Sequence, residues 1–235
     1  MLFRSIEQAS AGLDDEGKSK MHRQALDMLR FIEDSGGLQS KERFNALANA
    51  GFKAIMSSGG NVDWSQYRQF KSISGVSGMF INDESLFASL EPIIGLMKGS
   101  AAGTGLRTAY GRLNGSVRGL TKQAIGEFLN LGLWDPSKVQ LNSQGGIDKF
   151  KGNPFVTNDK FLESPDQWYM KVLLPKYEKL GLSMQERARM NNILFQNTGG
   201  RFFTPANAAS RDPAAGYRPA VPAGAVRRAW LAERR

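Results

Sequence analysis

The feature that most constrains the fold of this 235-residue chain is a repeated pattern: a helix-capping side chain, apolar residues three and four positions apart, then glycine. Such spacing places the apolar residues on one face of an α-helix. Paired glycines are typical of helix ends because they accept a left-handed backbone. The first two segments of this kind cover residues 14–37 and 40–60, and each ends in a glycine pair. No segment shows the sustained alternation of a half-buried strand.

Further helix starts are marked by capping residues, at Asp63, Asn82, Thr121, Ser164 and Ser183. Three of these residues, Asp63, Ser164 and Ser183, are followed three positions later by Gln or Glu, which is the spacing of a capping box. Pro92 is expected to kink or split the helix that it interrupts, because proline lacks a backbone donor. Gly199-Gly200 is expected to end the last helix, and residues 139–158, with their several glycines, to form a long irregular connection.

Together these signals predict an all-α fold: an irregular bundle of short helices with long Gly-rich connections and a disordered Pro/Ala/Arg tail. The expected organisation is an N-terminal helical segment over residues 1–80, a second helical segment over 81–203 and the tail over 204–235. Residues 205–224 are rich in proline and alanine and have no periodic apolar face to bury. The tail is expected to be a linker to a further domain or unrelated coding sequence.

Composition removes most enzyme classes. The chain has no cysteine and one histidine, His22, which is expected to be a partly exposed helix residue. Thiolate metal sites, multi-histidine metal sites and Ser-His-Asp triads are therefore not expected. We predict no catalytic, cofactor-binding or metal-ligating residue, and no enzymatic activity. No apolar stretch approaches the roughly 18–20 residues of a membrane-spanning helix, and the N-terminus lacks the apolar core of a signal peptide.

The net charge of +9 is concentrated in part in an acid-free window between Glu91 and Glu127. Its basic residues are Lys98, Arg107, Arg112, Arg118 and Lys122. Such a run is suited to contact phosphate or another anionic surface, and a solvated helix face explains it equally. The window supports an alternative function, a nucleic-acid or anionic-surface binding module over residues 92–126.

Glycines recur every four residues through the same region. They are Gly95, Gly99 and Gly103, then Gly111, Gly115 and Gly119, and only Arg107 interrupts the series. On a helix this spacing forms a groove that lets another backbone approach closely, as in membrane helices. Six helical glycines cost about 1 kcal/mol each relative to alanine unless a partner fills the groove. We predict close helix packing, with a flexible loop or a membrane-active segment as the alternatives.

Four segments resemble phage tail tape measure proteins. They are SLFASLEPIIGLMKGSAAGTGLRTAYGRLNGSVR (Ser85–Arg118), FLNLGLWDPSKVQLNSQGGIDKFKGNPF (Phe128–Phe155), WYMKVLLPKYEKLGL (Trp168–Leu182) and ILFQNTGGRFF (Ile193–Phe203). The resemblance implies a largely helical virion protein that lies in the tail tube, helps set tail length and leaves ahead of the DNA. It implies tail tube and tail assembly proteins as partners, self-association, assembly in the host cytoplasm and residence in the virion tail. It carries over no catalytic residue and no cofactor.

The chain departs from that family in two ways. Even as one continuous helix it would span only about 350 Å, and its glycine and proline breaks predict a compact bundle instead. The Pro/Ala/Arg tail matches nothing in the family. We therefore expect a fragment or a truncated prophage copy of a tape measure protein, with a structural role. A cell-wall lytic enzyme is a third hypothesis, because some relatives carry hydrolase domains, but no such motif is present.

Overall fold

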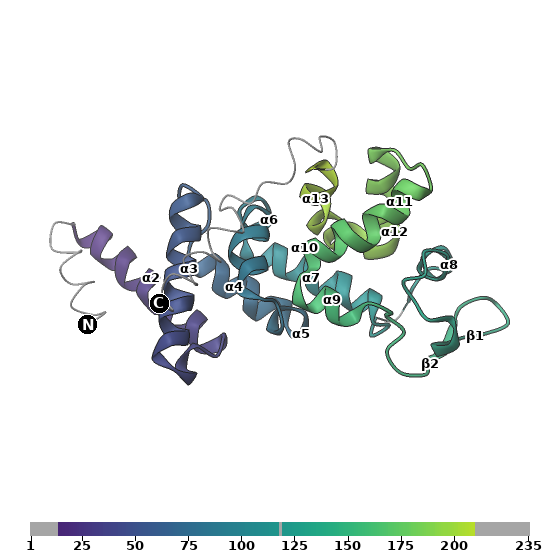
Figure 1. Cartoon of the computed structure of the whole chain (residues 1–235), viewed down its shortest axis with the longest axis horizontal. Helices are drawn as coiled ribbons and strands as arrows, with labels where there is room; N and C mark the ends of the chain where they lie inside the picture. The colour runs from purple at the N-terminus through teal and green to yellow at the C-terminus, as the bar shows by residue number, and fades with distance from the viewer. Residues whose placement is uncertain (1–13, 118, 210–235) are drawn as a thin grey trace, which may run out of the picture.

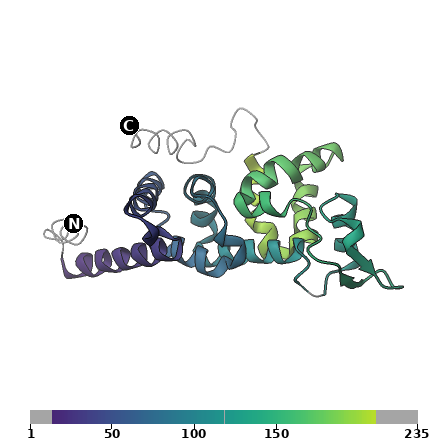
Figure 2. The same ribbon diagram turned by 60° about the horizontal axis from the view of Figure 1, so that its bottom comes forward.

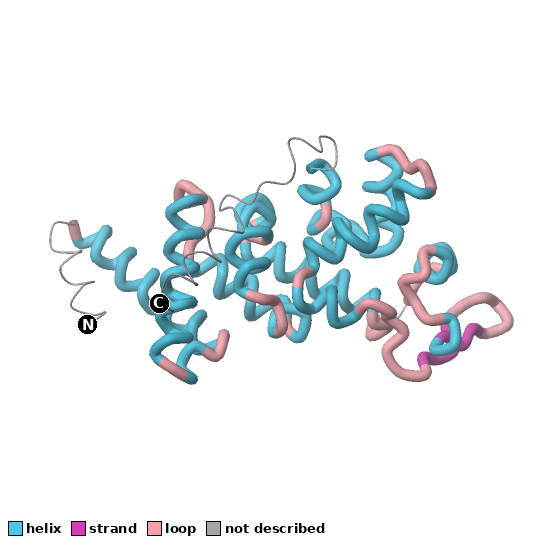
Figure 3. The backbone as a smooth tube through the Cα atoms, viewed as in Figure 1, coloured by secondary structure: helices cyan, strands magenta, loops and turns pink. Residues whose placement is uncertain are grey.

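The computed structural model describes residues 14–117 and 119–209, and these residues are mostly helical (Figure 1 and Figure 3), which confirms the all-α class. The α-helices are α2 (Asp15–Asp34), α3 (Lys41–Ser57), α4 (Trp64–Ser74), α5 (Val76–Met79), α6 (Glu91–Met97), α7 (Gly99–Leu113), α8 (Lys122–Asn130), α9 (Asn158–Glu163), α10 (Pro165–Trp168), α11 (Leu174–Lys179), α12 (Met184–Phe202) and α13 (Thr204–Ala209). The described part also contains 3₁₀-helices η1 (Gly37–Gln39) and η3 (Pro136–Lys138), π-helices η2 (Ser85–Ser89) and η4 (Tyr169–Leu173), and strands β1 (Val139–Leu141) and β2 (Ile147–Phe150).

Most helix starts form where the capping residues predicted them. At four of them a side-chain oxygen accepts a hydrogen bond from the backbone N–H three residues later: Asp14, Ser40, Asp63 and Thr121, at 2.8, 3.0, 2.9 and 3.1 Å. Ser183 and Glu186 form the predicted reciprocal capping box. Pro92 splits its segment as expected, because the π-helix η2 ends before it and α6 begins beside it.

Helix α7 organises the fold. Its most extensive contacts are with α4 on one side and α12 on the other. The molecule is elongated (Figure 2), with α4, α7 and α12 in its middle, α2 extending at one end and the β1–β2 hairpin at the other. One continuous hydrophobic core runs from Met28 in α2 to Ala206 in α13. The domain boundary predicted at residue 80 therefore passes through a shared core.

The predicted irregular connection over residues 139–158 is wrong, because this region begins with an antiparallel hairpin. Its arms pair Val139 with Phe150 and Gln140 with Lys149. The pairing continues toward the body of the protein through a bridge between Trp134 and Phe155. Both of these aromatic side chains are buried and anchor the hairpin base in the core. The pairing was not visible as alternation because each strand has only three or four residues.

Two predictions about the end of the chain are also wrong. Gly199-Gly200 does not end α12, which continues to Phe202; the backbone instead breaks at Gln196, whose φ is 60° and ψ 178°. Residues 204–209 are not part of a disordered tail but form α13, where Ala206 is buried and Asn207 donates to the Met184 carbonyl at 3.2 Å. The rest of the predicted tail, residues 210–235, lies outside the described residues.

Candidate functional site

The first part of the predicted glycine groove is a real packing surface against α4. A Cβ atom at Gly99 would overlap the carbonyl group of Gln66, and one at Gly103 would lie 2.8 Å from the Phe70 carbonyl oxygen. Real Cβ atoms do not approach other atoms this closely. Glycine at both positions therefore lets the backbones of α7 and α4 touch, as the four-residue spacing predicted. Gly95, in α6, makes a milder contact, with Val62 Cγ2 3.3 Å from a Cβ built there.

The opposite side of α7 contains a second glycine contact that the spacing did not reveal. A Cβ at Gly105 would lie 2.9 Å from the Thr198 carbonyl oxygen, and one at Gly199 would lie 3.3 Å from the Ala109 nitrogen. These two glycines bring α7 and α12 together. Gly105 falls outside the four-residue series, and Gly199 resembled a helix stop. The contact is formed by two glycines more than ninety residues apart, so neither position reveals it in the sequence.

The second half of the predicted groove is not a helix face. Gly111 is the last of these glycines within α7, and a Cβ there would lie 2.8 Å from Val117 in the turn that folds back on it. Gly115 and Gly119 lie beyond the end of α7 with φ of 75° and 74°. Their left-handed backbone accounts for glycine at both positions. A Cβ at Gly115 would also lie 2.7 Å from the ring of Phe150 in β2, so this glycine packs against the hairpin rather than against a helix. The loop alternative therefore describes these two residues.

One residue of the basic window is buried in the protein. Lys98, Arg107 and Lys122 are exposed, whereas Arg112 is only 2% exposed. Arg118 lies outside the described residues. The predicted set of five anion-contacting residues is therefore reduced by one, because Arg112 points into the protein.

Arg112 instead binds the broken helix α12. Its Nε donates to the Leu194 carbonyl and its Nη2 donates to the Ile193 carbonyl, the latter at 3.1 Å. These carbonyls lie just before the break at Gln196, where the regular helical hydrogen bonds to residues four positions later are interrupted. A cation at the end of a helix is also favoured by the helix dipole. Burial lowers the pKa of the Arg112 guanidinium relative to its usual value.

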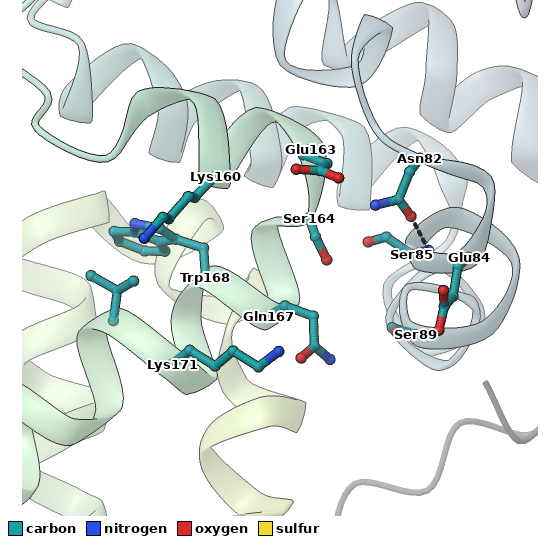
Figure 4. Close-up of a pocket in the computed structure, with 11 residues that line it drawn as sticks. Asn82, Glu84, Ser85, Ser89, Lys160, Glu163, Ser164, Gln167, Trp168 and Lys171 are labelled. Carbon is teal, nitrogen blue, oxygen red and sulfur yellow. Dashed lines mark hydrogen bonds between the residues drawn. The ribbon is translucent and has the colours of Figure 1, made fainter. Parts of the chain in front are cut away.

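A polar cleft of about 620 Å³ lies elsewhere, between residues 82–89 and residues 160–172 (Figure 4). Neither segment was singled out as a site from the sequence. Each wall includes one of the two described π-helices, η2 and η4. Such elements are rare and are often found at functional sites. Lys160 and Lys171 line the wall formed by α9 and η4, while Glu84 lies on the opposite wall and Glu163 at the end of α9 near Asn82.

The two walls are joined by a buried carboxylate. Asp166, 2% exposed, accepts hydrogen bonds from the hydroxyl groups of Ser85 at 2.6 Å and Ser164 at 3.1 Å. Ser164 precedes α10 at the predicted start, but its hydroxyl binds Asp166 rather than capping the backbone. Asn82 completes the junction, because its backbone N–H donates to the Glu163 carbonyl at 3.0 Å. The cleft is thus a fixed feature of the fold.

No family model matches this chain, and no curated protein or solved structure matches it. Within residues 14–117 and 119–209, no group of three or more His, Asp or Glu side chains could hold a metal ion. No helix in the described part is long and apolar enough to cross a membrane. Function is therefore inferred from the residues and their arrangement.

Proposed function

We propose that this chain is a non-catalytic structural component of a phage tail, a segment of a tail tape measure protein. The support is the resemblance of four sequence segments between Ser85 and Phe203, together with the way these segments pack. The proposal places the protein in the virion tail, after assembly in the host cytoplasm. Tail tube proteins, tail assembly proteins and further copies of the chain are its partners.

The observation that carries the proposal is that the four resembling segments contact one another in the fold. From the second segment, Trp134 Nε1 donates to the Leu113 carbonyl of the first at 2.5 Å. Arg112 in the first segment binds the Leu194 carbonyl of the fourth. In the third, the Tyr169 ring stacks on Phe203 of the fourth with centroids 4.9 Å apart. The four resembling segments therefore all contribute to the continuous core around α7.

The proposal is tested on phage particles released from the bacterium that encodes the chain. An antibody raised against the recombinant chain should detect it, or a longer protein that contains it, in purified full virions. It should be depleted from particles that have ejected their DNA, because a tape measure protein leaves the tail before the DNA. Its absence from full virions would overturn the proposal, and equal amounts before and after ejection would exclude the tape measure role within the tail.

The alternative of a nucleic-acid or anionic-surface module is less well supported by the geometry. It depends on the basic window, where Arg112 is buried and bound to carbonyl groups. A salt titration of DNA retention separates the two functions. A binding module should show strong retention with a steep loss as salt increases, whereas a tail component should show at most weak, nonspecific retention.

A further inference from the structure

We propose that the cleft between η2 and the α9–η4 segment binds an extended peptide segment of another polypeptide, one that carries an acidic and a basic side chain a few residues apart. The proposal does not depend on the tail function. The volume of the cleft, about 620 Å³, lies within the roughly 300–1,000 Å³ typical of ligand sites. A peptide, rather than an apolar ligand, is indicated by the side chains that surround the space.

The charges around the cleft are segregated by sign. Lys160 and Lys171 lie along the α9–η4 side, and the carboxylates of Glu84 and Glu163 lie on either side of Asn82 (Figure 4). All four side chains belong to exposed residues. The ion pairs found within residues 14–117 and 119–209 involve none of them. Opposite charges that face one space without pairing are available to a ligand of complementary charge.

Two amide side chains line the cleft as well, Asn82 between the two carboxylates and Gln167 beside Lys171 (Figure 4). Asn82 uses Oδ1 to accept from the Ser85 backbone N–H at 2.7 Å, which leaves its Nδ2 as a donor. Gln167 uses Nε2 to contact Asp166 Oδ2 at 3.3 Å, which leaves its Oε1 as an acceptor. One donor and one acceptor match the C=O and N–H of a peptide unit. The buried Ser85–Asp166–Ser164 contacts hold both walls in place before a ligand arrives, which limits the entropy lost on binding.

The test uses two blocked tetrapeptides, acetyl-Glu-Gly-Gly-Arg-amide and acetyl-Arg-Gly-Gly-Glu-amide, because the direction of the bound chain is open. The uncharged acetyl-Gln-Gly-Gly-Gln-amide is the control. Calorimetric titration of the full chain should show binding of at least one charged peptide, at least tenfold tighter than the control. NMR shift changes should fall on the residues that line the cleft. Absence of binding at millimolar concentration, or equal binding of the control peptide, would overturn the proposal.

Charge reversal provides the sharper test. Lys160→Glu with Lys171→Glu, and separately Glu84→Lys with Glu163→Lys, should each weaken binding at least tenfold. All four changes together should restore it to within about threefold, because the peptide can bind in the opposite direction. Lys138→Glu with Lys151→Glu, at the hairpin, is the matched control and should leave binding unchanged.

Failure of the fourfold variant to regain binding would overturn the peptide assignment, and so would an equal effect of the hairpin pair. Melting curves establish that each variant is folded. If a reversal pair is not folded, Lys160→Gln with Lys171→Gln and Glu84→Gln with Glu163→Gln replace it. Each neutral pair must still weaken binding for the proposal to hold. Loss of peptide binding would leave the virion experiment unaffected, so the two proposals fail independently.

Discussion

Helix α7 packs against α4 on one side and α12 on the other, and the two contacts are made differently. On the α4 side, Gly99 and Gly103 bring two backbones together, and the contact depends on the absence of side chains. On the α12 side, glycine contacts at Gly105 and Gly199 are combined with a buried cation, Arg112, that binds the carbonyls before the break at Gln196. The first contact depends on shape alone, whereas the second also depends on charge and hydrogen bonding.

The largest expected effect is at the α4 side. Gly99→Ala should destabilise the protein by about 3 kcal/mol or more, the upper end of overpacking costs, because its methyl group would overlap the Gln66 carbonyl and a backbone cannot move aside easily. The matched control is Gly126→Ala in α8, where nothing lies within 4 Å of an added Cβ. That change should stabilise by about 1 kcal/mol, the propensity difference. Urea unfolding measures both; equal effects would contradict the backbone contact.

The α12 side should respond to Arg112. Arg112→Met should destabilise by about 2–4 kcal/mol, because it leaves the buried Leu194 carbonyl and the partly buried Ile193 carbonyl without these donors. Arg112→Lys should recover only part of this loss, since lysine lacks the planar fork that reaches two acceptors. The exposed Arg107→Met is the control and should change the free energy of unfolding by less than about 0.5 kcal/mol. Full rescue by lysine would show that charge alone matters at this contact.

High pH should act on the α12 side through the buried hydroxyl groups of Tyr169 and Tyr177. Tyr177 donates to Asn191 Oδ1 at 2.9 Å, and Asn191 Nδ2 donates to Tyr169 at 3.0 Å. Burial raises the pKa of Tyr169 to about 12 and that of Tyr177 well above 10. Because the pKa is raised in the folded state, the tyrosine ionises at a lower pH in the unfolded chain. Its contribution to stability is therefore fully present below pH 10 and is lost as the pH rises from 10 to 12.

The free energy of unfolding should therefore fall by about 1.4 kcal/mol per pH unit for each such tyrosine above pH 10. Tyr169→Phe should reduce this slope, whatever its effect on stability at pH 8. Gly103→Ala, on the α4 side, should lower stability equally at both pH values and leave the slope unchanged. Denaturant unfolding between pH 8 and 11.5 measures both variants. A slope that Tyr169→Phe does not change would assign the alkaline loss to other groups.

The smallest effect should come from Gly119, beyond the end of α7, where glycine serves the backbone alone. At Gly119, φ is 74° and nothing lies within 4 Å of an added Cβ. Gly119→Ala and Gly119→Leu should therefore cost nearly the same, about 1–2 kcal/mol for a left-handed residue with a β-carbon. At Gly103 the same pair should be graded, with leucine more severe than alanine. A graded series at Gly119, measured by urea unfolding, would show a packing contact there.

Local chemistry made part of this structure predictable. Helix starts at Asp14, Ser40 and Ser183 involve hydrogen bonds to backbone groups three residues away, so the necessary partners are adjacent in the sequence. The glycine pairs that end the first two helical segments include Gly36 and Gly59, both with the left-handed backbone expected of a helix stop. Trp134, Trp168 and Tyr169 are buried, as their large aromatic side chains favour.

Apolar spacing alone did not predict correctly which residues of a helix are buried, because burial depends on the neighbouring helices. Phe52 and Met56 continue the apolar face of α3 by spacing, yet they are 54% and 76% exposed. The buried positions near that end are Gly51 and Ala54, because the Trp64 ring lies directly against Gly51. The spacing identified a helix but not which part of its surface α4 would cover.

By itself, the sequence determined the helical class, most helix starts and the close-packing surface at Gly99 and Gly103, since each follows from residues within one or two turns, whereas the partner of that surface, α4, came from the fold. The tertiary structure alone decided the roles of Arg112 and Gly199 and the existence of the polar cleft. Arg112 and Leu194 are 82 positions apart, and Ser85 and Asp166 are 81 apart. A carbonyl released by a helix break and a carboxylate shared between two walls have no signature at either position alone, because their partners come together only when the chain folds.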